Sequence, residues 1–154
     1  MKIPKIYEVV KKAVWFILRR TRPGLMLGLV DLGGGGNAWI GGYHVVASNA
    51  IVMNRRPLDY IKEKHPELYR PYIFVILLHE YIHTLGYHDE TETRAVTLHI
   101  AREIFGQHLI TNLAQNISAY LPYLQQMQYG WQPSEDHSIY YLIGFDESSV
   151  GYII

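Results

Sequence analysis

The spacing of apolar residues changes twice along the first half of the chain. Between residues 4 and 20, apolar positions recur every three or four residues with lysines and arginines between them, which predicts an amphipathic helix. Apolar runs at 25–32, 39–47 and 50–53 then predict strands. The four glycines at 33–36 lack the Lys-Ser/Thr pair of a phosphate-binding loop, so we interpret them as a flexible hairpin connection. These segments predict a small sheet of three or four strands.

The second half of the chain is predicted to be mostly helical. Residues 57–64 favour a short helix, and prolines then interrupt the chain before a longer apolar helix over 73–86. The glycine at its end suits the left-handed conformation that stops a helix. A further helix is expected to begin at the N-cap residue Asp89, with Glu92 at the third helical position of a capping box.

The helical pattern returns over 108–121 and weakens after that. Residues 130–154 are rich in tyrosine and carry acidic residues but no lysine or arginine, so they form an acidic extension. At 154 residues the chain is long enough to bury a core as one domain, 1–154. The predicted fold class is therefore α+β, with the small sheet packed against the helix over 73–86 and the helix that follows it.

The helix over 73–86 carries a set of catalytic groups. His79 and His83 are four residues apart, so both imidazoles project from one face of an α-helix and can bind one metal ion. Glu80 lies at the neighbouring edge, where a carboxylate can act as general base for a water activated by zinc. The alternative is a buried amphipathic helix whose two histidines are core residues.

The same residues resemble a known family. The segment Ile-Leu-Leu-His-Glu-Tyr-Ile-His-Thr-Leu is similar to the extended zincin signature, and the continuation Leu-Gly-Tyr-His-Asp-Glu-x-Glu-x-Arg resembles small archaeal zincin-like proteins such as the minimal gluzincins. The match covers residues 76–94, and a weaker likeness at 49–54 resembles the strand before the active-site helix. The resemblance implies a zincin-like fold, a catalytic Zn²⁺ and peptide or protein substrates.

A catalytic zinc site needs a third protein ligand, and the candidates are His88, Asp89, Glu90, Glu92, Glu103 and His108. If the two helices around the turn run antiparallel, residue 92 lies level with His83, and Glu103 lies about 15 Å too far along the helix. Glu92 is our principal candidate, and it also begins a Glu-x-x-Ala pattern that resembles the ligand helix of several gluzincin families. Asp89 is the alternative, because it stands where long-motif zincins place their third ligand.

The charge distribution separates the amino end from the rest. Seven of the fourteen lysines and arginines fall within residues 1–22, together with one acidic residue, although the net charge of the chain is zero. The helix there is expected to dock on the core with a solvated basic face; weak contact with anionic surfaces is the alternative. Cysteine is absent, which leaves histidine and carboxylate as metal ligands. Without a signal-like or membrane-spanning run, we expect a cytoplasmic protein.

Three functions are consistent with these patterns. The first is a zinc metallopeptidase in which Glu80 assists the attack of water on a peptide bond. The second is a metal-dependent endoribonuclease, because the histidine spacing and the following Gly-Tyr resemble a bacterial rRNA-maturation family. Neutral net charge does not favour nucleic acid as a partner. The third is a latent or non-catalytic zinc-binding protein, in which Asp136, Asp146 or Glu147 of the extension occupies the open zinc position.

Overall fold

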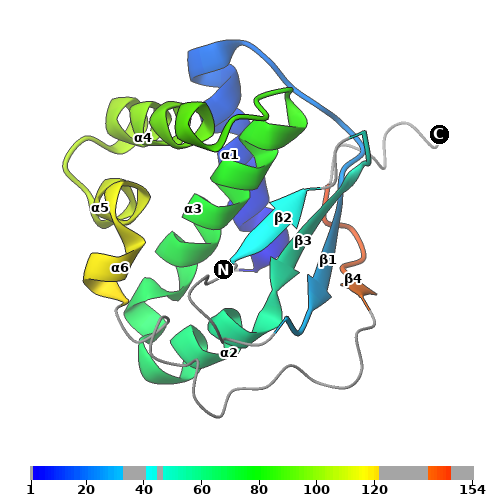
Figure 1. Ribbon diagram of the computed structural model, residues 1–154, viewed down its shortest axis with the longest axis vertical. Helices are drawn as coiled ribbons and strands as arrows, with labels where there is room; N and C mark the ends of the chain where they lie inside the picture. Colours follow the sequence, from blue (N-terminus) through cyan, green and yellow to red (C-terminus); the bar gives the residue numbers. More distant parts are fainter. Residues whose placement is uncertain (1, 33–40, 45–46, 122–138, 147–154) are drawn as a thin grey trace.

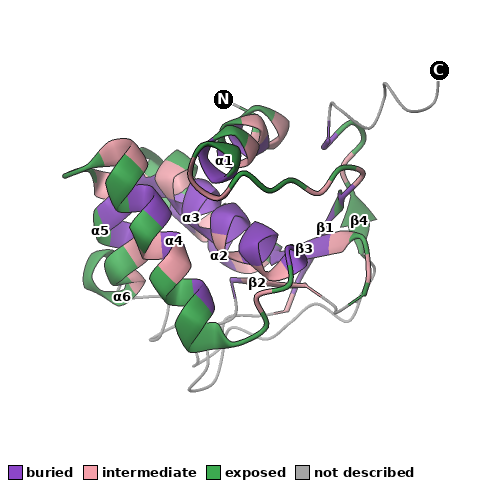
Figure 2. Ribbon diagram, turned by 90° about the horizontal axis from the view of Figure 1, so that it is seen from above, coloured by how far each residue is buried: buried purple, intermediate pink, exposed green. Residues whose placement is uncertain are grey.

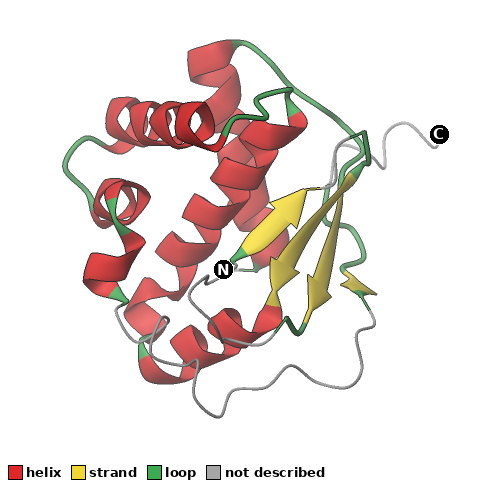
Figure 3. Ribbon diagram, in the orientation of Figure 1, coloured by secondary structure: helices red, strands yellow, loops and turns green. Residues whose placement is uncertain are grey.

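The computed structural model describes residues 2–32, 41–44, 47–121 and 139–146 of the chain. The glycine run at 33–36 and most of the acidic extension, including Asp136 and Glu147, lie outside the described residues. Helices gather on one side of the molecule and the sheet lies on the other (Figure 3). The predicted α+β class is confirmed: the described residues form six helices and one mixed sheet of four strands.

The sheet has the strand order β2-β3-β1-β4. The strands are β1 (Met26–Val30), β2 (Gly42–His44), β3 (Ala50–Asn54) and a short strand, β4 (Tyr140–Tyr141). β1 and β3 are parallel, whereas β2 pairs antiparallel with β3. The hairpin expected at the glycine run is therefore wrong, because β3 lies between the two strands that the run connects. The short strand β4 was not predicted, since two exposed tyrosines give no alternating pattern.

Helix α3 (Pro66–Thr84) is the central element of the fold. It contacts helices α1, α2, α4 and α5 and strands β2 and β3, and its apolar stretch is almost fully buried (Figures 1 and 2). It begins seven residues before the predicted helix, because Pro66 takes a first-turn position where no amide hydrogen is needed. Pro71 removes only one hydrogen bond near that end, a loss that burial of the following side chains outweighs.

The predicted end of this helix is confirmed. Leu85 is the C-cap residue, and Gly86 has a φ of 107°, which favours glycine. The chain then turns into α4 (Glu90–Phe105), where Asp89 is the N-cap residue as predicted and its carboxylate accepts hydrogen bonds from the amides of Thr91 and Glu92.

The remaining helices surround α3. Helix α1 (Ile3–Leu18) packs across it, and α2 (Arg55–Lys64) precedes it directly after β3. The segment predicted to be helical over 108–121 forms two short helices, α5 (Leu109–Gln115) and α6 (Ile117–Tyr120). Asn116 separates them, because its backbone is extended with a φ of −159°. Among the described residues, no helix combines the length and the apolar character needed to cross a membrane.

Candidate metal centre

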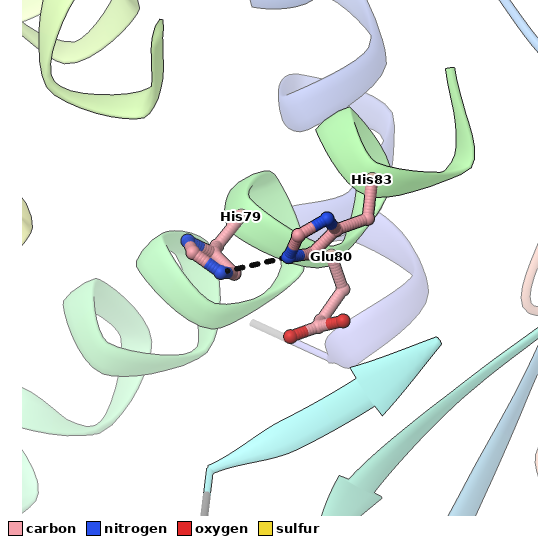
Figure 4. Close-up of side chains that lie close together, drawn as sticks. All are labelled: His79, Glu80 and His83. Atoms are coloured by element: carbon pink, nitrogen blue, oxygen red, sulfur yellow. Dashed lines mark hydrogen bonds between the residues drawn. The ribbon is translucent and has the colours of Figure 1, made fainter. Parts of the chain in front are cut away.

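Three predicted site residues come together on the last turns of α3. One ligand atom from each of His79, Glu80 and His83 lies within 4.8 Å of the others (Figure 4). The two imidazoles are 3.2 Å apart at their Nε2 atoms, with their ring planes nearly perpendicular. This arrangement follows from the four-residue spacing, which puts both side chains on one helical face. Among the described residues, this is the group of histidine and carboxylate side chains that could hold a metal ion.

The carboxylate nearest to the two histidines belongs to Glu90, the first residue of α4. Its Oε2 atom lies 3.1 Å from His79 Nε2, and its Oε1 atom lies 2.6 Å from His83 Nε2. Ligand atoms bound tetrahedrally to one zinc ion at about 2.0–2.1 Å are separated by about 3.3 Å. The 3.1 Å distance to His79 is close to that separation, whereas the 2.6 Å distance to His83 is shorter and is that of a hydrogen bond.

The hydrogen bonds of His83 fix which of its ring nitrogens faces Glu90. Its Nδ1 atom lies 2.6 Å from the carbonyl oxygen of Tyr87, which can only accept, so Nδ1 carries the hydrogen. In the neutral ring the Nε2 atom then presents a lone pair toward the oxygens of Glu90. Lone pairs of like polarity repel unless a proton or a cation lies between them. A protonated His83 donates that proton in a hydrogen bond to Glu90, and the same donor set fits a metal ion in place of the proton.

Glu80 faces a different environment from Glu90. Its side chain is buried, and its Oε2 atom has no hydrogen-bond partner among the described residues. Burial disfavours the charged carboxylate and raises its pKa to about 7, although the nearby His83 opposes the shift. A carboxyl group that titrates near neutral pH can both accept and return a proton, which is the property required of a general base.

The pKa of Glu90 is shifted in the opposite direction. Its partial burial alone would raise the pKa, but the charges of His79 and His83 and the hydrogen bond with His83 outweigh burial and lower it. Burial also lowers the pKa of His79, and the nearby Glu90 only partly offsets that effect. Both directions favour a charged carboxylate beside a neutral imidazole, the protonation states in which these groups bind metal.

A pocket of about 220 Å³ opens beside these groups. Strand β2 forms one wall of it, and the other wall comes from the end of α3 and the start of α4. Among the described residues, its lining contains no lysine or arginine: it consists of Gly42, Tyr43, His44, Glu80, His83, His88 and Glu90.

The close approach of β2 to α3 depends on Gly42. A Cβ atom on this residue would lie 2.9 Å from the carbonyl oxygen of Val52 and 3.2 Å from a methyl carbon of Ile76. It would also contact the side chain of Glu80, at 3.6 Å. The absence of a side chain therefore allows the strand to cover the buried carboxyl group.

The outer edge of β2 presents backbone groups beside the pocket. Tyr43 is opposite Val52 in the antiparallel pair, and the amide of Asn54 donates to the carbonyl of Gly41. In such a ladder the hydrogen-bonded residues alternate, so the N–H and C=O groups of Gly42 and His44 point away from β3. Among the described residues, β2 is one of the two edge strands of the sheet, so these groups have no sheet partner there.

Two arginines after α1 donate hydrogen bonds to the C-terminal end of α3. The guanidinium group of Arg22 donates to the carbonyls of Thr84 and Ser48, at 2.9 and 2.7 Å, and that of Arg20 donates to the carbonyl of Leu85. Positive charge at a helix C-terminus is favourable. The carbonyl of Ser48 also lies 3.0 Å from His44 Nε2, so Arg22 links α3 to the pocket residue His44.

The two predicted third ligands make no hydrogen bond or ion pair with the histidine pair, whose carboxylate partner is Glu90. Asp89 uses its carboxylate to cap α4, and the exposed Glu92 projects from a different face of that helix than Glu90. The reason is rotational: the buried Thr93 faces α3, at 3.4 Å from His83 Nδ1, and the residue three positions earlier shares its face. The contact places the start of α4 close to the predicted level of His83, but the predicted antiparallel arrangement is wrong, because α4 crosses α3 at a large angle (Figure 1). The sequence also did not determine which face of α4 meets the histidines.

Several other contributions were not found from the sequence. The partner of His83 Nδ1 is the backbone carbonyl of Tyr87, which no side-chain pattern could indicate. Neither the identity of the strand that lines the pocket nor the arginine contacts had a sequence signal, because both depend on tertiary packing. Tyr81 is buried and its hydroxyl accepts a hydrogen bond from the amide of Arg22, so it does not reach the pocket.

The comparisons with known proteins give no match. No protein-family model matches the chain, and neither curated proteins nor solved structures are similar to it at a significant level. A functional conclusion therefore rests on the geometry of the site.

Proposed function

We propose that the protein is a zinc-dependent metallopeptidase with a zincin-like active site. The observation that carries the proposal is the convergence of two imidazole nitrogens and the Glu90 carboxylate, beside a buried glutamate with a raised pKa. His79, His83 and Glu90 are the ligands in this proposal. A bound zinc ion would supply Lewis acidity, which lowers the pKa of water to about 7 and polarises a carbonyl group.

The chain's own residues then divide the work. Glu80 takes a proton from the attacking water and returns it to the leaving amine, which its pKa near neutrality makes efficient. The Tyr87 carbonyl keeps His83 in the tautomer that binds metal through Nε2. The outward backbone groups of Gly42 and His44 offer an extended peptide two residues with which to pair, in the manner of an added strand.

The ligand assignment is tested by the zinc content and zinc affinity of purified variants. Replacement of Glu90 with alanine is expected to weaken zinc binding by about 100-fold or more, because it removes a charged ligand. The matched control is Glu92→Ala, which removes a carboxylate from the same helical turn and should leave zinc binding within about twofold of wild type. Loss of zinc in Glu92→Ala alone would instead support the ligand predicted from the sequence.

The catalytic assignment is tested in the zinc-loaded protein. Glu80→Gln keeps the shape of the side chain and removes the base, so the variant should retain zinc and lose hydrolysis of an unfolded protein substrate by a factor of about 10² to 10⁴. Full activity in this variant would contradict the proposed mechanism. If His79→Ala binds as much zinc as wild type, the metal centre itself is wrong.

Of the alternatives, latency through Asp146 has evidence against it. Its buried carboxylate accepts hydrogen bonds from the side chain of Lys11 and the amide of Gly24, at 2.7 and 3.0 Å, so it does not face the pocket. Latency through Asp136 or Glu147 and the endoribonuclease function stay predictions. The described pocket lining, with two glutamates and no lysine or arginine, gives the ribonuclease no specific support.

A further inference from the structure

The outward face of α1 carries a regular stripe of basic and apolar residues. The exposed positions follow each other at spacings of three and four along the helix, which is one continuous face. We define this outer stripe by Lys2, Lys5, Val9, Lys12, Phe16 and Arg19, with Trp15 beside it. The stripe carries no acidic residue. The only acidic residue of the helix, Glu8, lies outside the stripe and pairs with Lys11 at 2.7 Å.

The apolar residues on and beside the stripe are far more exposed than those on the buried face of α1. Val9, Trp15 and Phe16 expose 39%, 48% and 65% of their surface, while a separate face of the helix buries Ile6, Tyr7, Val10, Ala13 and Val14 in the core. The helix therefore has two apolar faces, and the outer one is interleaved with positive charge. Scattered exposed apolar residues are common, but here Val9 and Phe16 are seven residues apart, in line with a similar row of basic residues.

We propose that the outer stripe binds the surface of an anionic lipid bilayer. Lysine and arginine are attracted to anionic headgroups, and tryptophan and phenylalanine insert their rings at the boundary with the acyl chains. A nucleic acid would match the positive charge and could stack a base on Phe16, but it offers the aliphatic side chain of Val9 no apolar partner. A lipid interface accepts both kinds of side chain along the whole stripe.

The stripe lies on the opposite side of α3 from the pocket. The ring of Tyr7 packs edge-on against Tyr81, with centroids 5.7 Å apart, so α1 covers the face of α3 that carries Tyr81. His79 and His83 are two residues from Tyr81 on either side, which on a helix points them the other way. Figures 1 and 2 agree that α1 and β2 lie on opposite sides of α3. A protein bound through the stripe thus keeps its pocket open to water.

Vesicle sedimentation of the full chain tests the proposal. Wild type should bind phosphatidylcholine vesicles that contain about one third phosphatidylserine and should not bind phosphatidylcholine alone. Lys5→Glu/Lys12→Glu should lower the partition coefficient at least about tenfold, and Phe16→Ser about threefold or more. The matched controls are Lys62→Glu/Lys64→Glu on α2 and the exposed Ile143→Ser, which should bind like wild type.

A fluorescence measurement locates the contact. In a chain with Trp39→Phe and Trp131→Phe, Trp15 is the remaining tryptophan, and its emission should shift to the blue on addition of the anionic vesicles. Equal binding by wild type and the stripe variants, equal loss in the α2 control, or binding to RNA but not to vesicles would overturn the proposal. The variant Glu80→Gln should bind vesicles normally, so a failure of the proposed peptidase function is distinguished from a failure of this one.

Discussion

At the scale of single residues, the buried carboxyl group of Glu80 gives the metal-free protein a specific pH dependence. Folding raises the pKa of this group from 4.5 to about 7, so the folded state favours the protonated form. As pH rises from about 4.5 to 7, the charged form must be buried, and the free energy of unfolding falls. Above pH 7 the loss in the free energy of unfolding is complete. It is of the order of 3 kcal/mol, because each unit of pKa shift corresponds to about 1.4 kcal/mol.

We therefore expect Glu80→Gln to stabilise the metal-free protein at pH 8 and to change its stability little at pH 4.5. The measurement is urea unfolding of chelator-treated protein at both pH values, with the exposed Glu92→Gln as control. The control should follow wild type at both. If the difference in the free energy of unfolding between Glu80→Gln and wild type is the same at both pH values, the carboxyl group is not held neutral by burial.

Some of the residues at the site could be predicted from the sequence, and others could not. The positions of His79, Glu80 and His83 follow from a spacing that any α-helix imposes, so their grouping could be predicted from the chain alone. The position of the carboxylate that lies beside the two histidines, that of Glu90, could not be predicted in this way. Whether Glu90 or Glu92 faces the histidines depends on how α4 is rotated, and the buried Thr93 determines this rotation through tertiary packing.

At the scale of elements, the helices of the site were easier to predict than the strands. Asp89 and Gly86 set the turn between α3 and α4 through local backbone chemistry, and the structure confirms both. The order of the strands depends on contacts distant in sequence: β1 pairs with β3 across more than twenty residues, which a local hydrophobic pattern does not encode. The sequence therefore could not show that β2 lies at an edge of the sheet, where it forms one wall of the pocket.

The packing of β2 on α3 leads to a prediction for Gly42. A methyl group at this position would meet the Val52 carbonyl oxygen at 2.9 Å, and that backbone atom cannot move away without shifting β3. Gly42→Ala should destabilise the protein by about 1–3 kcal/mol. The displaced strand should admit water to Glu80 and lower hydrolysis, while zinc binding persists because all three proposed ligands are on helices.

A graded series makes this test independent of simple unfolding. Gly42→Val adds two more carbon atoms and should reduce hydrolysis further, with zinc content still near that of wild type. Zinc analysis and substrate hydrolysis on the same folded samples, checked by circular dichroism, separate the two effects. A wild-type rate in Gly42→Ala would show that the strand does not need to approach Glu80 so closely.

At the scale of the whole molecule, Asp146 ties the last described segment to the opposite end of the chain. Its carboxylate accepts hydrogen bonds from the Lys11 ammonium group at 2.7 Å and from the Gly24 amide at 3.0 Å. The ring of the neighbouring Phe145 stacks on Tyr7. These contacts join α1, the loop before β1 and the segment that carries β4. A buried charged carboxylate with such partners is expected to stabilise the fold, because its removal leaves polar groups without their charged acceptor.

Asp146→Asn should therefore lower the free energy of unfolding by about 2 kcal/mol. Limited proteolysis should cut the variant faster near residues 139–146, while zinc affinity should stay unchanged, because the carboxylate lies on the α1 side of α3. The matched control is Asp59→Asn, an exposed carboxylate 3.6 Å from Arg55, for which a change below about 0.5 kcal/mol is expected. A rise in zinc affinity or in hydrolysis when Asp146 is replaced would instead mean that this carboxylate competes for the metal centre.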